Sequence, residues 1–585
     1  MFTTRPELLG TFGVAASTHW LASATAMAVL EEGGNAFDAS VAAGFALQVV
    51  EPHLNGPGGD MPALIWSADE ERLRVVCGQG PAPAAASIDA FHALGLDIVP
   101  GTGLLATCVP GAVDAWLSMA RDYGTMDLAR LLRPAIEFAG GGYPLVGHAV
   151  ATIASVEALF REEWPTSAAV YLPGGRLPEA GRLFRNPALA RTWTRLVEEA
   201  EAAGRSREDR IEAARRIFQE GFIAAAIADF AAGNEVMDSS GRRHRGLIAG
   251  DDMANWRASY EEPLTYDYGR YRVAKAGPWS QAPVFLQQLA LLKGFDIEGM
   301  DPLGADFAHV VVECAKLAFA DREAFYGDPA HVDVPMERLL SDDYNDERRK
   351  LVGGEASREI RPGAVDGFAS TVRVGERRGP VLGAGEPTMA LADGDTCHLD
   401  VIDRWGNMVS ATPSGGWLQS SPVIPSLGFC LGSRMQMFWL EEGLPGSLAP
   451  GKRPRTTLSP SFAFRDGEPW MAFGTPGGDG QDQWSLIFFL RHVHHGMNLQ
   501  AAIDAPTFQS HHFPSSFYPR QADPGRLAVE ERLPADTVAE LGRRGHDVEV
   551  IGPWSIGRIS ACARDDGLLK AAANPRLMQG YAAGR

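Results

Sequence analysis

The residues with the clearest chemical potential are Asp395-Thr396-Cys397-His398, about two thirds of the way along the chain. Thr396 heads an alternating run, 399–402, and the turn residues Gly406-Asn407 follow it, which predicts a strand and a tight turn. If the bond between Asp395 and Thr396 is cut, Thr396 becomes a new N-terminus. A threonine with a free α-amino group carries its own base, which can activate its weak hydroxyl nucleophile. The pattern indicates a self-processing amidase or acyltransferase, provided that this bond is cut.

The cysteines suggest other chemistry only at one position. Cys397 lies beside the candidate nucleophile, so its thiol is an alternative nucleophile. The six cysteines are scattered and form no CxxC pair, so zinc-ribbon and thioredoxin-type sites have no support.

Composition and charge exclude several classes of partner. Apolar residues make up 45% of the 585 residues, enough for a large buried core. The formal net charge of −20 argues against nucleic-acid and anionic-membrane partners, because phosphate contacts need clustered Lys and Arg. We see no apolar run of about 18 residues and no secretory signal, so we expect no membrane span and a cytoplasmic location.

Local patterns predict the elements that must position Thr396. An alanine-rich helix should stop at Gly33-Gly34, and Asn35 should cap a second helix over 36–50. Residues 105–235 and 281–326 are mostly helical in pattern. After Thr396, hairpins are expected around Asp466-Gly467 and 565–567, with helices over 485–495 and 534–545.

Residues 341–395 have a different character from the rest of the chain. Asp, Arg, Gly and Pro dominate, and apolar periodicity fades. We interpret this segment as a mobile connector that ends at Thr396. It divides the chain into a large segment, 1–395, and a small segment, 396–585, which carries the nucleophile.

Six ordered motifs over most of the chain resemble those of the gamma-glutamyltransferase family of N-terminal nucleophile hydrolases. They are Gly33-Gly34-Asn35-Ala36-Phe37-Asp38-Ala39, the Val50-Glu51-Pro52-His53 run with Gly56 and Gly58-Gly59, Val109-Pro110-Gly111, Thr396-Cys397-His398, Gly451-Lys452-Arg453-Pro454 with Ser459-Pro460, and Gly474-Thr475-Pro476-Gly477-Gly478. The resemblance implies an α+β fold, a four-layer αββα sandwich built by both segments. It also implies cleavage between Asp395 and Thr396, and a heterodimer of the two fragments or a dimer of such heterodimers.

The resemblance also implies roles for individual residues, with no cofactor and no metal. Thr396 would be the nucleophile and Ser414 the hydroxyl residue that supports it. The backbone N–H groups of Gly477 and Gly478 would bind the negative oxygen of the tetrahedral intermediate. Gln79, Arg434, Thr456 and Thr457 occupy the family's substrate-binding positions. The acyl group would pass from Thr396 to water or to an amine.

The expected glutamate-binding residues are largely replaced. Gln79 stands where the family has an arginine for the substrate α-carboxylate, and Gln cannot form a charged bidentate clamp. Met437 and Gly416 stand where an aspartate and an asparagine hold the α-amino group. Thr456 and Thr457 replace two serines and keep their hydroxyls.

These changes predict a small-molecule amide substrate whose acyl part lacks the free α-amino group of glutamate. Dicarboxylic monoamides, such as glutaryl amides, and acylated amines with a terminal carboxylate are candidates, with Arg434 or Arg455 as the carboxylate partner. Arg434 could instead pair with an internal acid. Two further functions stay open: a true gamma-glutamyltransferase or glutathione hydrolase, and an unprocessed, non-catalytic relative with a binding role.

The histidines invite a metal site. His492, His494 and His495 form an HxHH run, and His511 and His512 follow. This run ends a helical pattern without acidic or cysteine partners at ligand spacing, so structural roles are favoured.

Overall fold

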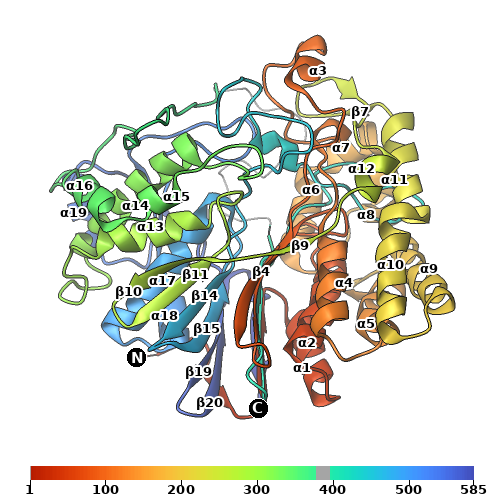
Figure 1. Cartoon of the computed structure of the whole chain (residues 1–585), viewed down its shortest axis with the longest axis horizontal. Helices are drawn as coiled ribbons and strands as arrows, with labels where there is room; N and C mark the ends of the chain where they lie inside the picture. The colour runs from red at the N-terminus through yellow and green to blue at the C-terminus, as the bar shows by residue number, and fades with distance from the viewer. Residues whose placement is uncertain (1, 377–395) are drawn as a thin grey trace.

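The computed structural model describes residues 2–376 and 396–585, and two seven-stranded sheets lie at its centre (Figure 1). The first sheet runs in the order β1 (Leu8–Gly10), β20 (Leu568–Ala573), β19 (Ser560–Asp565), β15 (Glu468–Gly474), β14 (Ser461–Arg465), β11 (Tyr271–Lys275) and β10 (Leu264–Tyr268). The second runs in the order β21 (Tyr581–Gly584), β2 (Gly13–Ser17), β12 (Leu399–Asp403), β13 (Met408–Ala411), β3 (Met61–Ser67), β4 (Arg72–Gly78) and β9 (Ser259–Glu261).

Helices cover the outer face of each sheet, which completes the four-layer αββα sandwich (Figure 1). The second sheet packs against α1 (Trp20–Glu31), α2 (Ala36–Val50) and α4 (Ala112–Tyr123). Outside these helices lie α5 (Leu128–Gly141), α9 (Pro187–Ala203) and α10 (Arg207–Glu220). The first packs against α13 (Pro283–Leu292) and α17 (Gln481–His495), and α14 (Ala305–Phe325) packs on α13.

Shorter elements surround these layers. The helices are α3 (Ile88–Ala93), α6 (Gly147–Ser155), α7 (Glu157–Glu162), α8 (Pro165–Tyr171), α11 (Phe222–Gly233), α12 (Gly250–Ala254), α15 (Met336–Leu339), α16 (Asp342–Arg349), α18 (Leu499–Asp504) and α19 (Ala535–Arg543). The strands are β5 (Tyr143–Pro144), β6 (Leu183–Phe184), β7 (Val236–Met237), β8 (Arg243–His244), β16 (Phe508–Ser510), β17 (Arg526–Glu530) and β18 (Asp547–Ile551).

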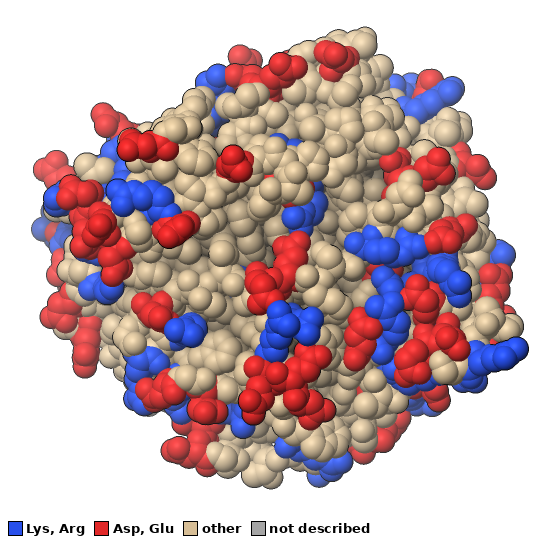
Figure 2. Space-filling view, viewed as in Figure 1, with Lys and Arg blue, Asp and Glu red and all other residues tan. Residues whose placement is uncertain are grey.

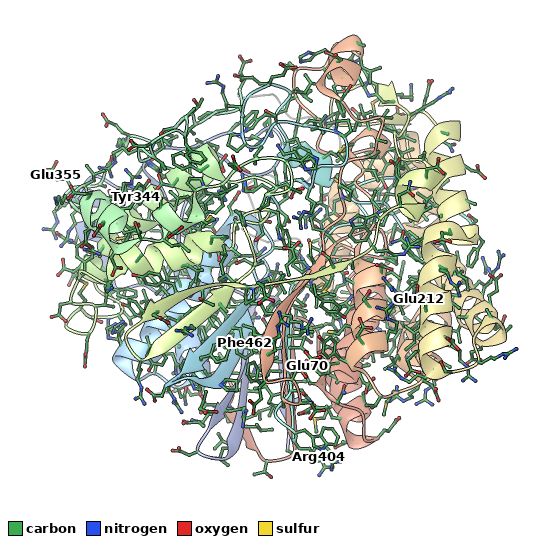
Figure 3. All side chains as sticks on the ribbon, in the orientation of Figure 1. Glu70, Glu212, Tyr344, Glu355, Arg404 and Phe462 are labelled. Carbon is green, nitrogen blue, oxygen red and sulfur yellow. The ribbon has the colours of Figure 1, made fainter. Side chains whose placement is uncertain are left out.

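Strand alternation explains why both faces of each sheet are buried. In β2, Ala15 joins the helix-facing core, whereas Val14 and Ala16 point into the core between the sheets. Figure 3 labels Phe462 in this inner core, where its ring lies 6.4 Å from that of Trp66 of the opposite sheet. The strand that follows the predicted nucleophile, β12, is therefore enclosed by protein on both faces.

A helix cap and a close helix–helix contact fix α2 and α4, which pack on the second sheet. The side chain of Asn35 accepts hydrogen bonds from the backbone N–H groups of Phe37 and Asp38, and the Asp38 carboxylate accepts one from Asn35 N–H at 3.1 Å. A Cβ at Gly44 would lie 2.5 Å from the ring of Trp116, so glycine permits α2 and α4 to pack closely.

The segment that we interpreted as a connector begins with regular structure. It contains α16, which carries Tyr344 (Figure 3). The Tyr344 hydroxyl donates to buried Asp321 at 2.9 Å, and Arg348 pairs with the same carboxylate at 3.2 Å. Polar contacts therefore order residues that carry no strong apolar pattern. Residues 377–395, including Asp395, lie outside the described residues.

Within the described ranges, no helix has the length and apolar character needed to cross a membrane. On the face shown in Figure 2, basic side chains lie among acidic ones and form no continuous basic area.

Candidate functional site

Thr396 lies at the start of the small segment, just ahead of β12, and is almost fully buried. Its backbone pairs with Ser414 in an isolated antiparallel bridge, and the two side-chain oxygens are 3.1 Å apart. Cys397 N–H donates to Pro413 O at 2.9 Å and continues this pairing. The structure thus brings together the predicted nucleophile and its predicted supporting hydroxyl.

Ser414 also pairs with Asp60 of the large segment. Asp60 N–H donates to Ser414 O at 2.8 Å, and Ser414 N–H donates to Asp60 O at 2.9 Å. The Asp60 carboxylate then accepts from Arg434 Nε at 2.9 Å. Arg434 is therefore linked to Thr396 through two intermediate residues.

The three guanidinium nitrogens of Arg434 have different surroundings. Its pairing with Asp60 confirms the alternative of an internal acid for one nitrogen. Its buried Nη1 and Nη2 have no hydrogen-bond partner among the described residues. The guanidinium carbon lies 5.0 Å from the ring centre of Trp417 and 6.0 Å from that of Phe517. A buried guanidinium with two unsatisfied nitrogens is suited to an anionic or hydrogen-bond-accepting group.

The surroundings of Arg434 are apolar where the family would bind an amino group. Met437 packs with Trp417 and Phe517 in a small buried cluster. Gly416 has φ +66°, and a Cβ there would lie 3.0 Å from Gly59 N. Neither residue presents a side chain that could pair with an ammonium group.

Gly477 and Gly478 form a tight loop between β15 and α17. Their φ angles are +127° and +49°, which favour glycine. A Cβ on Gly477 would lie 2.0 Å from the ring of Trp484. Gly477 O accepts Gly480 N–H at 2.8 Å, and Gly478 O accepts Gln281 Nε2 at 3.2 Å.

The predicted substrate-binding threonines, Thr456 and Thr457, are buried. They lie at the end of residues 453–457, which we call the Thr456 segment. Thr456 N–H donates to Trp279 O at 3.0 Å, and Thr456 O accepts Gln281 N–H at 2.8 Å. Thr457 Oγ1 is buried without a partner in the described part of the chain. Gln281 thus joins the Thr456 segment to the Gly477–Gly478 loop.

The contacts of Gln79 and Arg455 give less support to a role in substrate binding. Gln79 Nε2 donates to Gly80 O at 3.0 Å, and in the described ranges no hydrogen bond joins its side chain to the other predicted site residues. Arg455 donates to Ser516 Oγ at 2.8 Å and to Glu323 at 2.7 Å, so it is occupied by protein groups. Of the two arginines considered for a substrate carboxylate, Arg434 has the unsatisfied nitrogens.

The environment of Cys397 disfavours a thiol nucleophile. Its Sγ donates to Glu51 Oε2 at 2.9 Å, and burial raises the pKa of the thiol well above its usual value. Burial also raises the pKa of Glu51, which accepts from Thr18 Oγ1 at 2.6 Å. A thiol held in its protonated form is a poor nucleophile.

The histidines of the HxHH run make structural contacts. His492 Nδ1 lies 2.6 Å from Met497 O, and His494 Nε2 lies 2.8 Å from the Tyr268 hydroxyl. Burial lowers the pKa of His511 and of His512 to about 4.

Another group, His309, Glu313 and His546, has ligand atoms close enough for a metal. Its Glu313 already pairs with Lys316 at 2.6 Å and with Arg361 at 3.3 Å. Two cations beside the only carboxylate of the group disfavour a metal ion there.

Sequence reasoning did not assign roles to Asp60, to Gln281 or to Arg322, whose Nη1 donates to Gln281 Oε1 at 2.9 Å. Asp60 directly follows the glycines of the Gly56–Gly59 run, a position that could have marked it as part of the site. Gln281 and Arg322 stand within helical patterns without a motif, so no local signal marks them.

Comparisons with known proteins identify the family of this chain. A gamma-glutamyltranspeptidase family model matches residues 22–584. The "Glutathione hydrolase-like YwrD proenzyme" of Bacillus subtilis is 30% identical over 97% of this chain and 98% of its own. The "Oxamate amidohydrolase proenzyme" of Klebsiella pneumoniae is 31% identical over 98% of this chain and 99% of its own.

Solved structures agree with the fold over the full length. "Structure of LmbA2991HD" has a TM-score of 0.95 and 55% identity, covering 100% of both chains. A cephalosporin acylase from Bacillus halodurans has a TM-score of 0.83 and 29% identity, covering 100% of this chain and 98% of its own.

Proposed function

Because the chain belongs to the gamma-glutamyltransferase family, an N-terminal nucleophile hydrolase family of amidohydrolases and acylases, we propose that it is a self-processing enzyme with Thr396 as nucleophile. The observation that carries the proposal is the 3.1 Å approach of the Thr396 and Ser414 hydroxyls at the head of a buried strand. Ser414 can hold the Thr396 hydroxyl in one orientation, which a nucleophile requires.

The processing step releases the catalytic amine. Thr396 Oγ1 attacks the carbonyl carbon of Asp395, the peptide C–N bond breaks, and an ester forms between the two residues. Water then hydrolyses the ester, which leaves a carboxylate on Asp395 and a free α-amino group on Thr396. An α-amino group ordinarily titrates at about 7.7–8.0, so it can accept a proton near neutral pH.

Amide cleavage then follows the same chemistry. The Thr396 amine takes the hydroxyl proton as the oxygen attacks the substrate carbonyl, and the N–H groups of the Gly477–Gly478 loop stabilise the negative oxygen. The Thr396 ammonium group then gives its proton to the substrate nitrogen. The substrate C–N bond breaks, the substrate amine leaves, and an acyl ester on Thr396 remains. Water or an acceptor amine releases the acyl group and regenerates the hydroxyl.

The substrate class proposed is an amide whose acyl part ends in a carboxylate and lacks an α-amino group. Arg434 Nη1 and Nη2 would bind the carboxylate, and the cluster of Trp417, Met437 and Phe517 offers no partner for an ammonium group. Oxamate, which the Klebsiella relative is named for, is itself a dicarboxylic monoamide without an α-amino group.

An intact-mass spectrum beside a Thr396→Ala variant tests processing. We expect two fragments of about 42 and 20 kDa, roughly 395/585 and 190/585 of 62.8 kDa, in the native protein and one chain in the variant. Thr192→Ala is a matched control, since Thr192 is a buried threonine on α9 that bonds Leu427 O. An uncut chain in every sample would overturn the proposal and favour the binding relative.

Acyl specificity is tested with paired p-nitroanilides of the processed protein. We expect faster hydrolysis of the glutaryl than of the γ-glutamyl compound, because only the second brings an ammonium group against Met437. Equal rates would mean that Met437 and Gly416, at the positions where the family binds the α-amino group, do not determine acyl specificity. A strong preference for the γ-glutamyl compound would identify a true gamma-glutamyltransferase, the function that the glutathione hydrolase-like relative favours.

A further inference from the structure

We propose that Gln281 and Arg322 are positioning residues that fix the Gly477–Gly478 loop against the Thr456 segment. The inference rests on the proposed function, in which this loop binds the negative oxygen of the intermediate. Neither residue belongs to a motif of the sequence, and both lie in the large segment, whereas the loop lies in the small segment.

Gln281 uses three of its polar groups to join separate parts of the site. Its N–H donates to Thr456 O at 2.8 Å, and its Nε2 donates to Gly478 O at 3.2 Å. Its Oε1 accepts from Arg322 Nη1 at 2.9 Å. The side-chain amide is thereby held in one orientation, with its NH2 group toward the loop.

Arg322 holds the loop from the other side of Gly478. Its Nη1 donates to the carboxylate of Asp479, the residue after Gly478, as well as to Gln281. The same carboxylate accepts Ser516 N–H at 2.8 Å and Ser516 Oγ at 2.6 Å.

The guanidinium of Arg322 is itself fixed in place. Its Nη2 donates to Pro514 O at 3.1 Å, and the group lies over the rings of Phe319 and Phe513. Arg322 is fully buried, so solvent does not compete for these bonds.

These contacts hold the two peptide units on either side of Gly478. A peptide unit is planar, so fixing a carbonyl oxygen also fixes the N–H on the opposite side of the same unit. Gly480 N–H holds Gly477 O and thereby orients the N–H of Gly478. Gln281 holds Gly478 O and so fixes the next peptide unit, which carries the N–H of Asp479. With the units on both sides of Gly478 held, rotation about its backbone bonds, and with it the direction of its N–H, is restrained.

Glycine needs these external anchors because its own dihedral angles are weakly restricted. An oxyanion site gains its effect from donors that are already oriented before the reaction. Loss of the Gln281 contact should therefore weaken binding of the intermediate more than binding of the substrate.

The main test replaces Gln281 without changing charge. In Gln281→Leu we expect kcat for glutaryl-p-nitroanilide to fall about 10–100-fold with KM nearly unchanged, because one oxyanion donor typically contributes that much or more. Gln281→Glu keeps the size and the bond to Arg322 but places an oxygen against Gly478 O, so it should be no better. Arg322→Lys keeps the charge but cannot reach both Gln281 and Asp479, so a smaller loss of the same kind is expected.

Gln287→Leu is the matched control. Gln287 is a fully buried glutamine on α13 whose side-chain amide donates to Asp321 at 2.6 Å rather than to the loop. Its loss removes a buried amide bond of the same kind but should leave kcat near the native value.

A transition-state probe separates positioning from general damage. 3-Carboxypropylboronic acid can form a tetrahedral adduct with a threonine hydroxyl, whereas glutarate resembles the product. In Gln281→Leu the boronate should lose affinity in parallel with kcat/KM, and the inhibition constant of glutarate should stay constant. Parallel losses for both compounds would overturn the inference.

Hydrogen exchange gives an outcome that does not depend on turnover. Gln281→Leu should speed exchange of the amides over 477–480, and Gln287→Leu should not. If native protein hydrolyses none of the anilides, the proposed function fails, and exchange still decides whether Gln281 fixes the loop. If native protein is active and Gln281→Leu matches it in kcat and in exchange, the positioning role is wrong.

Discussion

Arg434 shows how one side chain can serve both the fold and a substrate. Its Nε is bound to Asp60, which keeps the guanidinium plane fixed beside Trp417. Its other two nitrogens are buried without a partner among the described residues, a condition that costs free energy unless a ligand relieves it. A preorganised, desolvated arginine is therefore available for an acyl carboxylate.

We expect Arg434→Met to lower kcat/KM for glutaryl-p-nitroanilide by about 10–100-fold, because a hydrogen bond to a charged group contributes about 1.5–3 kcal/mol. Steady-state kinetics should show the loss mainly in KM. Butyryl-p-nitroanilide, which has no carboxylate, is the internal control and should lose much less. A loss of the same size for both compounds would mean that Arg434 acts only through Asp60.

The sequence indicated Arg434 but not the rest of its environment. Asp60 is 374 positions away, and no local pattern connects the two residues. Thr396 and Ser414 were more accessible to sequence reasoning, since 18 positions separate them across a predicted turn. Chemistry carried by short-range motifs could be predicted, whereas contacts made by isolated polar residues depend on tertiary packing.

At the scale of elements, strong local signals agreed with the structure. The predicted helix over 36–50 matches α2, and both predicted hairpins formed, as β14–β15 and β19–β20. The helix within residues 341–349 was not predicted from the sequence, because α16 is held by the buried carboxylate of Asp321 rather than by an apolar stripe. Sequence patterns record apolar periodicity well and buried polar networks poorly.

The loop between β15 and α17 should tolerate no side chain at Gly477. Gly477→Ala meets two penalties: a backbone angle of φ +127° and a Cβ 2.0 Å from the Trp484 ring. We expect a lower melting temperature, from strain of about 1–3 kcal/mol or more, together with a large fall in kcat. Gly467→Ala is the matched control, because Gly467 has φ +87° and open space around it. If the two variants behave alike in calorimetry and kinetics, the ring contact has no importance.

The cap of α1 makes stability depend on pH. His19 Nδ1 accepts Leu21 N–H at 3.1 Å, and burial lowers the pKa of His19 to about 3. The unfolded chain binds a proton below its ordinary pKa of about 6.5, so this group's contribution is present above that pH and is lost as pH falls toward 3.

At pH 5 the loss amounts to about 2 kcal/mol of unfolding free energy for one histidine. His19→Asn keeps an N-cap acceptor without titrating, so its stability should fall less than the native value between pH 7 and 5. Urea unfolding at both pH values measures the difference. His92→Asn, the same substitution at an exposed position on α3, is the control for the exchange of side chain itself. An unaltered slope in His19→Asn would refute this account of the cap.

At the scale of the whole molecule, the two proposed fragments are interleaved in both sheets. In the second sheet, β12 of the small segment pairs with β2 of the large segment, and β13 pairs with β3. In the first sheet, β1 pairs with β20, and β11 pairs with β14. The two segments therefore cannot be separated without breaking strand pairs in both sheets.

This interleaving predicts that cleavage leaves a single particle. Separation would break strand ladders in both sheets and expose the inner core around Phe462, which is far costlier than opening a surface contact. On size exclusion under native conditions, the processed protein should therefore elute with both fragments in equal amounts and near the volume of uncut Thr396→Ala. In strong denaturant the same sample should resolve into two chains, while Thr396→Ala stays one. Loss of the smaller fragment from the native peak would contradict a fold in which each sheet needs strands from both sides of the cleavage site.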